Sequence, residues 1–141
     1  NAFFQTNTKM AAELQNAVRR ACGDLTGKTL LDLYCGSGFF SLPFSKEAKR
    51  TIGVELVEEA IVAAKENAAA NNLTVEYEVS KTETFDWKGT KPDVVIVDPP
   101  RAGMHEKLVQ QILKMKAQKV VYVSSLENGF ILRILKKGMR K

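Results

Sequence analysis

Short apolar segments alternate with longer segments of helical period along the chain. Five segments rich in β-branched residues predict strands, namely Thr29–Tyr34, Thr51–Glu55, Val75–Val79, Val94–Asp98 and Lys119–Ser124. The fourth is apolar without alternation, which is typical of a strand that is covered on both faces. Strands of this kind separated by helices predict an α/β fold built on a parallel sheet.

Apolar residues at helical spacing predict the connecting helices. They are Met10, Leu14, Val18 and Ala21 in the first helix, Ile61, Ala64 and Ala68 in the second, and Leu108, Ile112 and Met115 in the third. We expect a last helix over Leu126–Lys137. Right-handed crossovers then give a doubly wound sheet, with a ligand at the carboxyl ends of its strands.

Composition places the chain among ordinary globular proteins. Its 141 residues are 45% hydrophobic and 26% charged, which predicts one domain over residues 1–141. The absence of a long apolar run and of a signal peptide favours a cytoplasmic location and no membrane partner. Two Cys and one His make a metal site unexpected. The net charge of +5 lies in the basic segment 133–141, so charge alone is a weak argument for RNA binding.

The first strand leads into a glycine-containing turn. Gly36 and Gly38 let the backbone turn tightly and approach a ligand. A dinucleotide fingerprint would require a third glycine at position 41, where the chain has Ser41. Glu55 follows Gly38 by 17 residues and ends the second strand, where a carboxylate can accept both hydroxyls of a ribose. This combination favours an adenosine cofactor without a pyrophosphate, and S-adenosylmethionine is the obvious candidate.

Five motifs resemble those of a known family. They are Phe3-Phe4-Gln5-Thr6-Asn7, Asp32-Leu33-Tyr34-Cys35-Gly36-Ser37-Gly38, Gly53-Val54-Glu55, Asp98-Pro99-Pro100-Arg101-Ala102-Gly103 and Tyr122-Val123-Ser124. Over about residues 3–125 the chain resembles the RNA uracil-C5 methyltransferases. The resemblance implies a Rossmann-like class I methyltransferase core with strand order 3-2-1-4-5, S-adenosylmethionine as cofactor, and tRNA or rRNA as partner.

The resemblance also implies roles for individual residues. Gln5, Tyr34, Glu55 and Asp98 match positions where the family binds S-adenosylmethionine, and Gly36 and Gly38 complete this expected cofactor pocket. Arg101 matches an arginine beside the catalytic loop, where a guanidinium can hold an RNA phosphate or orient a catalytic group.

The chain departs from the family at the catalytic nucleophile. The family adds a Cys thiolate to carbon 6 of uracil, and its fifth strand ends Tyr-Val-Ser-Cys-Asn-Pro, whereas Ser125 occupies that position here. A hydroxyl is a far weaker nucleophile than a thiolate. We interpret Cys35 as structural and not as a replacement thiol, and His105, a possible base by position, as a helix-cap or surface residue.

The resemblance further leads us to expect the last two strands of the family fold, and the general-base Glu that follows them, to lie beyond Lys141. We therefore expect cofactor binding with little or no uracil methylation. The alternatives are an inactive module that binds S-adenosylmethionine and RNA, or an amino-group N-methyltransferase, against which Arg101 argues because that class has an aromatic residue there. The fifth strand is expected to form an exposed edge that favours self-association.

Overall fold

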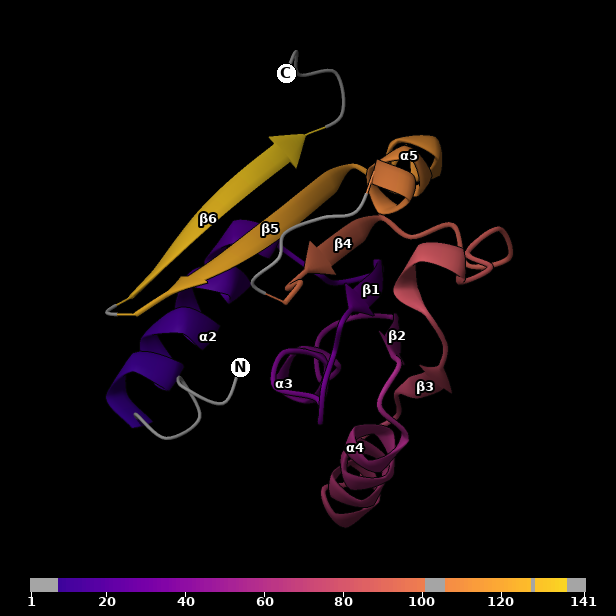
Figure 1. Ribbon diagram of the computed structural model, residues 1–141. Helices are drawn as coiled ribbons and strands as arrows, with labels where there is room; N and C mark the ends of the chain where they lie inside the picture. Colours follow the sequence, from indigo (N-terminus) through magenta and orange to yellow (C-terminus); the bar gives the residue numbers. More distant parts are fainter. Residues whose placement is uncertain (1–7, 101–105, 128, 137–141) are drawn as a thin grey trace.

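The computed structural model describes residues 8–100, 106–127 and 129–136. Its elements, in chain order, are α2 (Thr8–Cys22), β1 (Thr29–Leu33), α3 (Ser41–Phe44), β2 (Arg50–Glu55), α4 (Glu58–Ala70), β3 (Glu76–Val79), the 3-10 helix η1 (Thr82–Thr84), β4 (Val94–Val97), α5 (Glu106–Met115), β5 (Lys119–Leu126) and β6 (Gly129–Lys136). All six strands form one sheet in the order β3-β2-β1-β4-β5-β6 (Figure 1).

The sheet is parallel from β3 to β5, which confirms the doubly wound α/β fold and the order 3-2-1-4-5 of the five expected strands. Successive side chains of a strand point to opposite faces, so the sheet has two apolar layers. Leu30 and Ile96 belong to the layer that packs against α2 and α3. Leu31 and Val95 belong to the layer that packs against α5. Both faces of the central strands are thus covered.

The expected last helix over Leu126–Lys137 is wrong, because this segment completes an antiparallel hairpin between β5 and β6. Phe130 and Leu132 of β6 pack against the layer that contains α2, so the strand buries one face without forming a helix. The sequence carries a signal for this hairpin. Asn128-Gly129 between two apolar runs is a general hairpin signal, although the register places Gly129 in β6, opposite Leu126.

This hairpin also corrects the expected edge of the sheet. Strand β5 is paired on both sides, by β4 and β6, so it is not an exposed edge. The expectation that the sheet stops at its fifth strand is therefore wrong by one strand, and β6 and β3 are the two edges. No helix in the described part of the chain is long and apolar enough to span a membrane.

Candidate functional site

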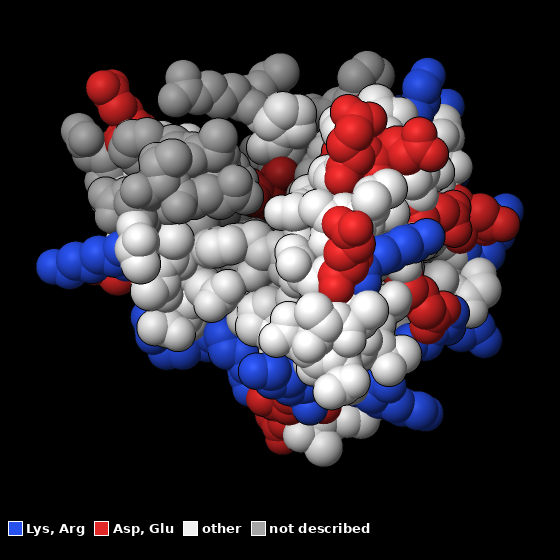
Figure 2. All heavy atoms as spheres, turned by 90° about the horizontal axis from the view of Figure 1, so that it is seen from below, with Lys and Arg blue, Asp and Glu red and all other residues white. Residues whose placement is uncertain are grey.

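The register of the sheet brings three predicted residues to one place. Leu33, the last residue of β1, lies opposite Val54 of β2 and Val97 of β4. The residues that follow these positions, Tyr34, Glu55 and Asp98, therefore lie together at the carboxyl ends of three neighbouring strands. In an open α/β sheet this is where ligands bind. Figure 2, seen from below Figure 1, shows acidic atoms recessed in a hollow of this side of the molecule.

The turn after β1 requires unusual backbone conformations. Tyr34, Gly36 and Gly38 all have positive φ, at 59°, 57° and 98°. A Cβ added at Gly36 would meet no atom within 4 Å, so this glycine leaves open space beside the backbone. A Cβ added at Gly38 would lie 2.7 Å from side-chain atoms of Leu42 and from the Tyr77 hydroxyl. The two glycines thus serve different purposes, one facing free space and the other allowing close packing.

The Glu55 carboxylate is held by the backbone around it. One oxygen accepts a hydrogen bond from the amide of Gly36 at 2.9 Å, and the other accepts one from the amide of Val57 at 3.0 Å. A carboxylate can accept about four hydrogen bonds, so these two leave capacity for two hydroxyl donors. The arrangement fixes the carboxylate next to the glycine turn and keeps it able to bind a ribose.

Asp32, in the middle of β1, is a site residue that the sequence reasoning missed. Its side chain is fully buried, and Oδ2 accepts a hydrogen bond from the Ser41 amide at 3.1 Å. Its Oδ1 has no hydrogen-bond partner within the described ranges. A charged residue inside the apolar segment Thr29-Leu30-Leu31-Asp32-Leu33 was the available signal, because carboxylates are rarely buried without a partner.

Burial makes this region unfavourable for negative charge. Burial, together with the nearby Asp98, raises the pKa of Asp32 well above its usual range. Burial likewise raises the pKa of Asp98 to about 6. The ionised form of a buried carboxyl group is stabilised by a positive charge placed beside it. The electrostatics of the site therefore favour a cationic group on the ligand.

Tyr77 of β3 closes the site from the neighbouring strand. Its hydroxyl and that of Ser41 form a hydrogen bond of 2.7 Å. Its ring lies where a side chain at Gly53 would be, because a Cβ there would be 2.6 Å from the ring. Ser41, which replaces the third glycine of a dinucleotide site, thus links Asp32 on β1 to Tyr77 on β3.

Of the two predicted catalytic residues, Ser125 lies in the described part of the chain and Arg101 lies outside it. Ser125 lies near the end of β5 opposite Phe130 of β6, and its hydroxyl is buried without a partner in the described part of the chain. Burial, followed by the charges of Asp32 and Glu55, raises the pKa of Cys35, which keeps its sulfur protonated. Gln5, Arg101 and His105 lie outside the described residues.

Tyr34 lies between the glycine turn and the α5 side of the sheet. It packs against the apolar layer that contains Leu33 and Val97. Burial and then the carboxylate of Glu83 raise the pKa of its hydroxyl to about 12, so it remains a neutral hydrogen-bonding group. A neutral aromatic side chain at this place is suited to line a pocket.

The chain is similar to known RNA methyltransferases. Residues 1–81 match the tRNA (uracil-5-)-methyltransferase family. An uncharacterised RNA methyltransferase of Caldanaerobacter subterraneus is 42% identical over 133 residues, covering 92% of this chain and 29% of the relative. An RNA methyltransferase of Clostridium tetani is 40% identical over 152 residues, covering 98% of this chain and 33% of the relative. The chain thus spans about a third of the length of these curated relatives.

Solved structures agree in fold. The Pyrococcus abyssi tRNA (uracil-54, C5)-methyltransferase, in complex with S-adenosyl-L-homocysteine, is 38% identical with a TM-score of 0.69, covering 77% of this chain and 27% of that one. A Haemonchus contortus phosphoethanolamine N-methyltransferase has a TM-score of 0.75 at 16% identity, covering 88% of this chain and 28% of that one. At this low identity the likeness shows the fold alone. With this fold, the glycine turn and the matching sequence, the chain belongs to the tRNA (uracil-5-)-methyltransferase family.

Proposed function

We propose that the carboxyl ends of β1, β2 and β4 bind S-adenosylmethionine. The observation that carries this proposal is the strand register, which places the glycine turn, Glu55 and Asp98 together. Glu55 would accept the ribose hydroxyls, with Gly36 leaving space beside it. Asp32 and Asp98 would face the cationic methionine end, whose charge relieves their unfavourable ionisation. The Pyrococcus abyssi relative, which is bound to S-adenosyl-L-homocysteine, supports this assignment.

The proposed reaction is methyl transfer to carbon 5 of a uracil in RNA. The cofactor supplies an activated methyl group on its sulfonium. The residues described above would orient it, and Asp98 at the end of β4 lies where the cofactor and the base would meet. An RNA substrate is supported by the family match and by relatives named as RNA methyltransferases.

We propose further that this chain binds the cofactor without efficient turnover. Carbon 5 of uracil needs activation by a nucleophile added at carbon 6, and Ser125 stands where the family resemblance places the thiolate. The structure supports a weak nucleophile, because no described group accepts the proton of the Ser125 hydroxyl. The buried, protonated thiol of Cys35 cannot substitute for it.

Calorimetry with S-adenosylhomocysteine tests the binding site. We expect saturable binding that Glu55→Gln weakens about tenfold or more, because an amide cannot accept both hydroxyls as a carboxylate does. Glu66→Gln is the matched control, since Glu66 is an exposed acid on α4 and should leave the affinity unchanged. Absence of heat at millimolar ligand would overturn the proposed site.

A second assay tests turnover separately. The chain is incubated with methyl-labelled S-adenosylmethionine and tRNA or rRNA transcripts, and the product nucleosides are identified by mass spectrometry. We expect no 5-methyluridine from the unaltered chain, since the hydroxyl of Ser125 is a far weaker nucleophile than a thiolate. Substantial 5-methyluridine from the unaltered chain would contradict the assignment of Ser125 as an inadequate nucleophile.

A further inference from the structure

Three residues form a row across the strands β1, β2 and β3. Asp32 lies opposite Gly53 in the parallel register, and Gly53 lies opposite Tyr77. Leu31 and Leu33, the neighbours of Asp32 in β1, belong to the layer that packs against α5, so Asp32 points to the other face of the sheet. A buried acid, a glycine and a tyrosine thus lie side by side on the face against which α2 and α3 pack.

The glycine in the middle of this row lets the Tyr77 side chain cross β2. A Cβ at Gly53 would lie 2.6 Å from the Tyr77 ring, so a larger residue there would displace the ring. The Tyr77 hydroxyl lies 2.7 Å from the position of a Cβ on Gly38 and forms a hydrogen bond of 2.7 Å with the Ser41 hydroxyl. Burial raises the pKa of Tyr77, so this hydroxyl is neutral. A side chain of β3 therefore contacts the glycine turn that follows β1.

Ser41 connects Tyr77 to Asp32. Ser41 is fully buried, and its hydroxyl bonds to the Tyr77 hydroxyl while its amide donates a hydrogen bond to Oδ2 of Asp32 at 3.1 Å. Two polar groups of one residue thus join the tyrosine to the acid. Because this amide fixes Oδ2, it sets the orientation of the carboxyl group. Oδ1 of Asp32, which has no hydrogen-bond partner among the described residues, is the oxygen left to interact with a ligand.

We propose that Tyr77 is a positioning residue of the cofactor site, which acts through Ser41 to orient the Asp32 carboxyl group toward the amino-acid end of the cofactor. This inference rests on the S-adenosylmethionine site proposed above. Because Asp32 is buried, it acts on the ammonium group by charge rather than by contact, and the ammonium in turn favours the ionised carboxylate. Glu55, at the ribose end, is held by backbone amides instead. The two halves of the cofactor are therefore held by separate sets of contacts.

Calorimetry with two ligands tests this positioning role. S-adenosylhomocysteine carries the amino-acid end, whereas methylthioadenosine has the same adenosine and thioether without it. We expect Tyr77→Phe, which keeps the ring, to weaken binding of S-adenosylhomocysteine about fivefold and to change that of methylthioadenosine by less than about twofold. Ser41→Ala should have the same effect. The double variant should lose no more affinity than either single variant, because both substitutions remove the same hydrogen bond.

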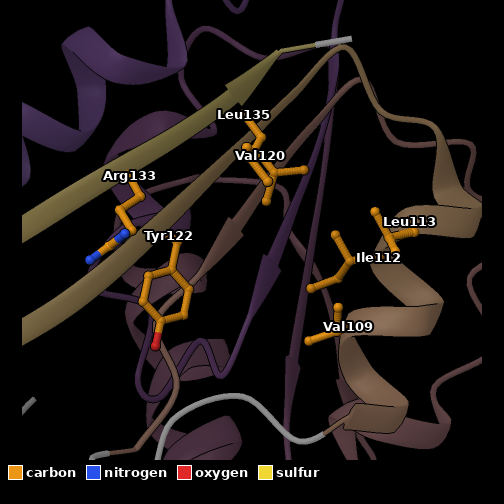
Figure 3. A pocket seen from close by; sticks show the side chains of 7 residues that line it. All are labelled: Val109, Ile112, Leu113, Val120, Tyr122, Arg133 and Leu135. Atoms are coloured by element: carbon orange, nitrogen blue, oxygen red, sulfur yellow. The ribbon is translucent and has the colours of Figure 1, made fainter. Parts of the chain in front are cut away.

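Two further variants locate the effect. Tyr122→Phe is the matched control, because Tyr122 packs against the α5 layer on the opposite face of the sheet and lines a pocket between α5 and the β5–β6 hairpin (Figure 3). It should leave the affinity for both ligands unchanged. Asp32→Asn removes the charge through which Tyr77 acts, so it should selectively weaken binding of S-adenosylhomocysteine. In this background Tyr77→Phe should have no further effect on that ligand.

The outcomes distinguish the positioning role from the site itself. Selective loss of S-adenosylhomocysteine affinity in Tyr77→Phe and Ser41→Ala supports the role of Tyr77. If the unaltered chain binds this ligand and Tyr77→Phe weakens both ligands equally or neither, the positioning role is wrong and the cofactor site stands. A further effect of Tyr77→Phe in the Asp32→Asn background also contradicts it. Failure of the unaltered chain to bind S-adenosylhomocysteine overturns both proposals. Because both affinities are measured in one variant, partial unfolding lowers them alike and cannot imitate a selective loss.

Discussion

Gly53→Ala perturbs the contact between β2 and β3 beside the proposed cofactor site. Gly53 is in β2, and its φ is not in the left-handed region, so alanine is compatible with its backbone. The new Cβ would nevertheless lie 2.6 and 2.7 Å from ring carbons of Tyr77 and 2.9 Å from the sulfur of Cys35. The substitution is therefore a steric test of one packing arrangement.

The structure sets the expected magnitude. Carbon atoms pack at about 3.5–4.0 Å, so the Tyr77 ring must move by roughly 1 Å. Overpacking of this kind costs about 1–3 kcal/mol. Movement of the ring also weakens the hydrogen bond between Tyr77 and Ser41, which contributes about 0.5–1.5 kcal/mol. We expect a loss of about 2–4 kcal/mol in the free energy of unfolding, or roughly 8–16 °C in melting temperature.

Urea unfolding of single and double variants measures this effect. In a Tyr77→Ala background the two closest contacts are removed and the 2.9 Å approach to the Cys35 sulfur remains. Gly53→Ala should therefore cost less there than in the unaltered chain, with a coupling energy of about 1–3 kcal/mol. Gly89→Ala is the control, because a Cβ at Gly89 meets nothing within 4 Å and should change stability by less than about 1 kcal/mol. A neutral Gly53→Ala, or a cost independent of Tyr77, would refute the reasoning.

Other predictions concern the same region. Asp98→Asn should raise stability at pH 7 by about 2 kcal/mol and have no such effect near pH 4. The raised pKa of Asp98 means that its ionisation destabilises the fold as pH rises from about 4 to about 6, which thermal melts across this range will check. Ser41→Ala and Tyr77→Phe should each cost about 1 kcal/mol but not add in a double variant, because they remove the same hydrogen bond. Burial raises the pKa of Cys22 to about 12 and also raises that of Cys35, so both thiols should resist Ellman's reagent at pH 8 until the protein is unfolded.

The central strands could be predicted from sequence because their local pattern and their tertiary environment agree. The run Val94–Val97 is apolar at every position, and all four residues are buried. The positions of Glu55 and Asp98 followed in the same way, since residues that end parallel strands meet at one edge of a sheet. Here a local signal was sufficient to place residues that are distant in the chain.

The segment after β5 was harder because its sequence supports two structures. Phe130, Ile131, Ile134 and Leu135 satisfy a helical period, yet the same segment is a continuous apolar run that can form a strand. Pairing with β5 and packing of Phe130 against the α2 layer decide the outcome. Both are contacts with residues outside the segment, so its own periodicity could not distinguish the two structures.

The sequence by itself determined the alternation of strands and helices, the glycine turn and the acids at the strand ends, because these depend on patterns local to each segment. Tertiary structure alone decided that Asp32 is buried beside Asp98, that Tyr77 fills the space above Gly53, and that β6 is an edge of the sheet. Desolvation, close packing and strand pairing arise between residues far apart in the chain. They exist only once the segments have been brought together.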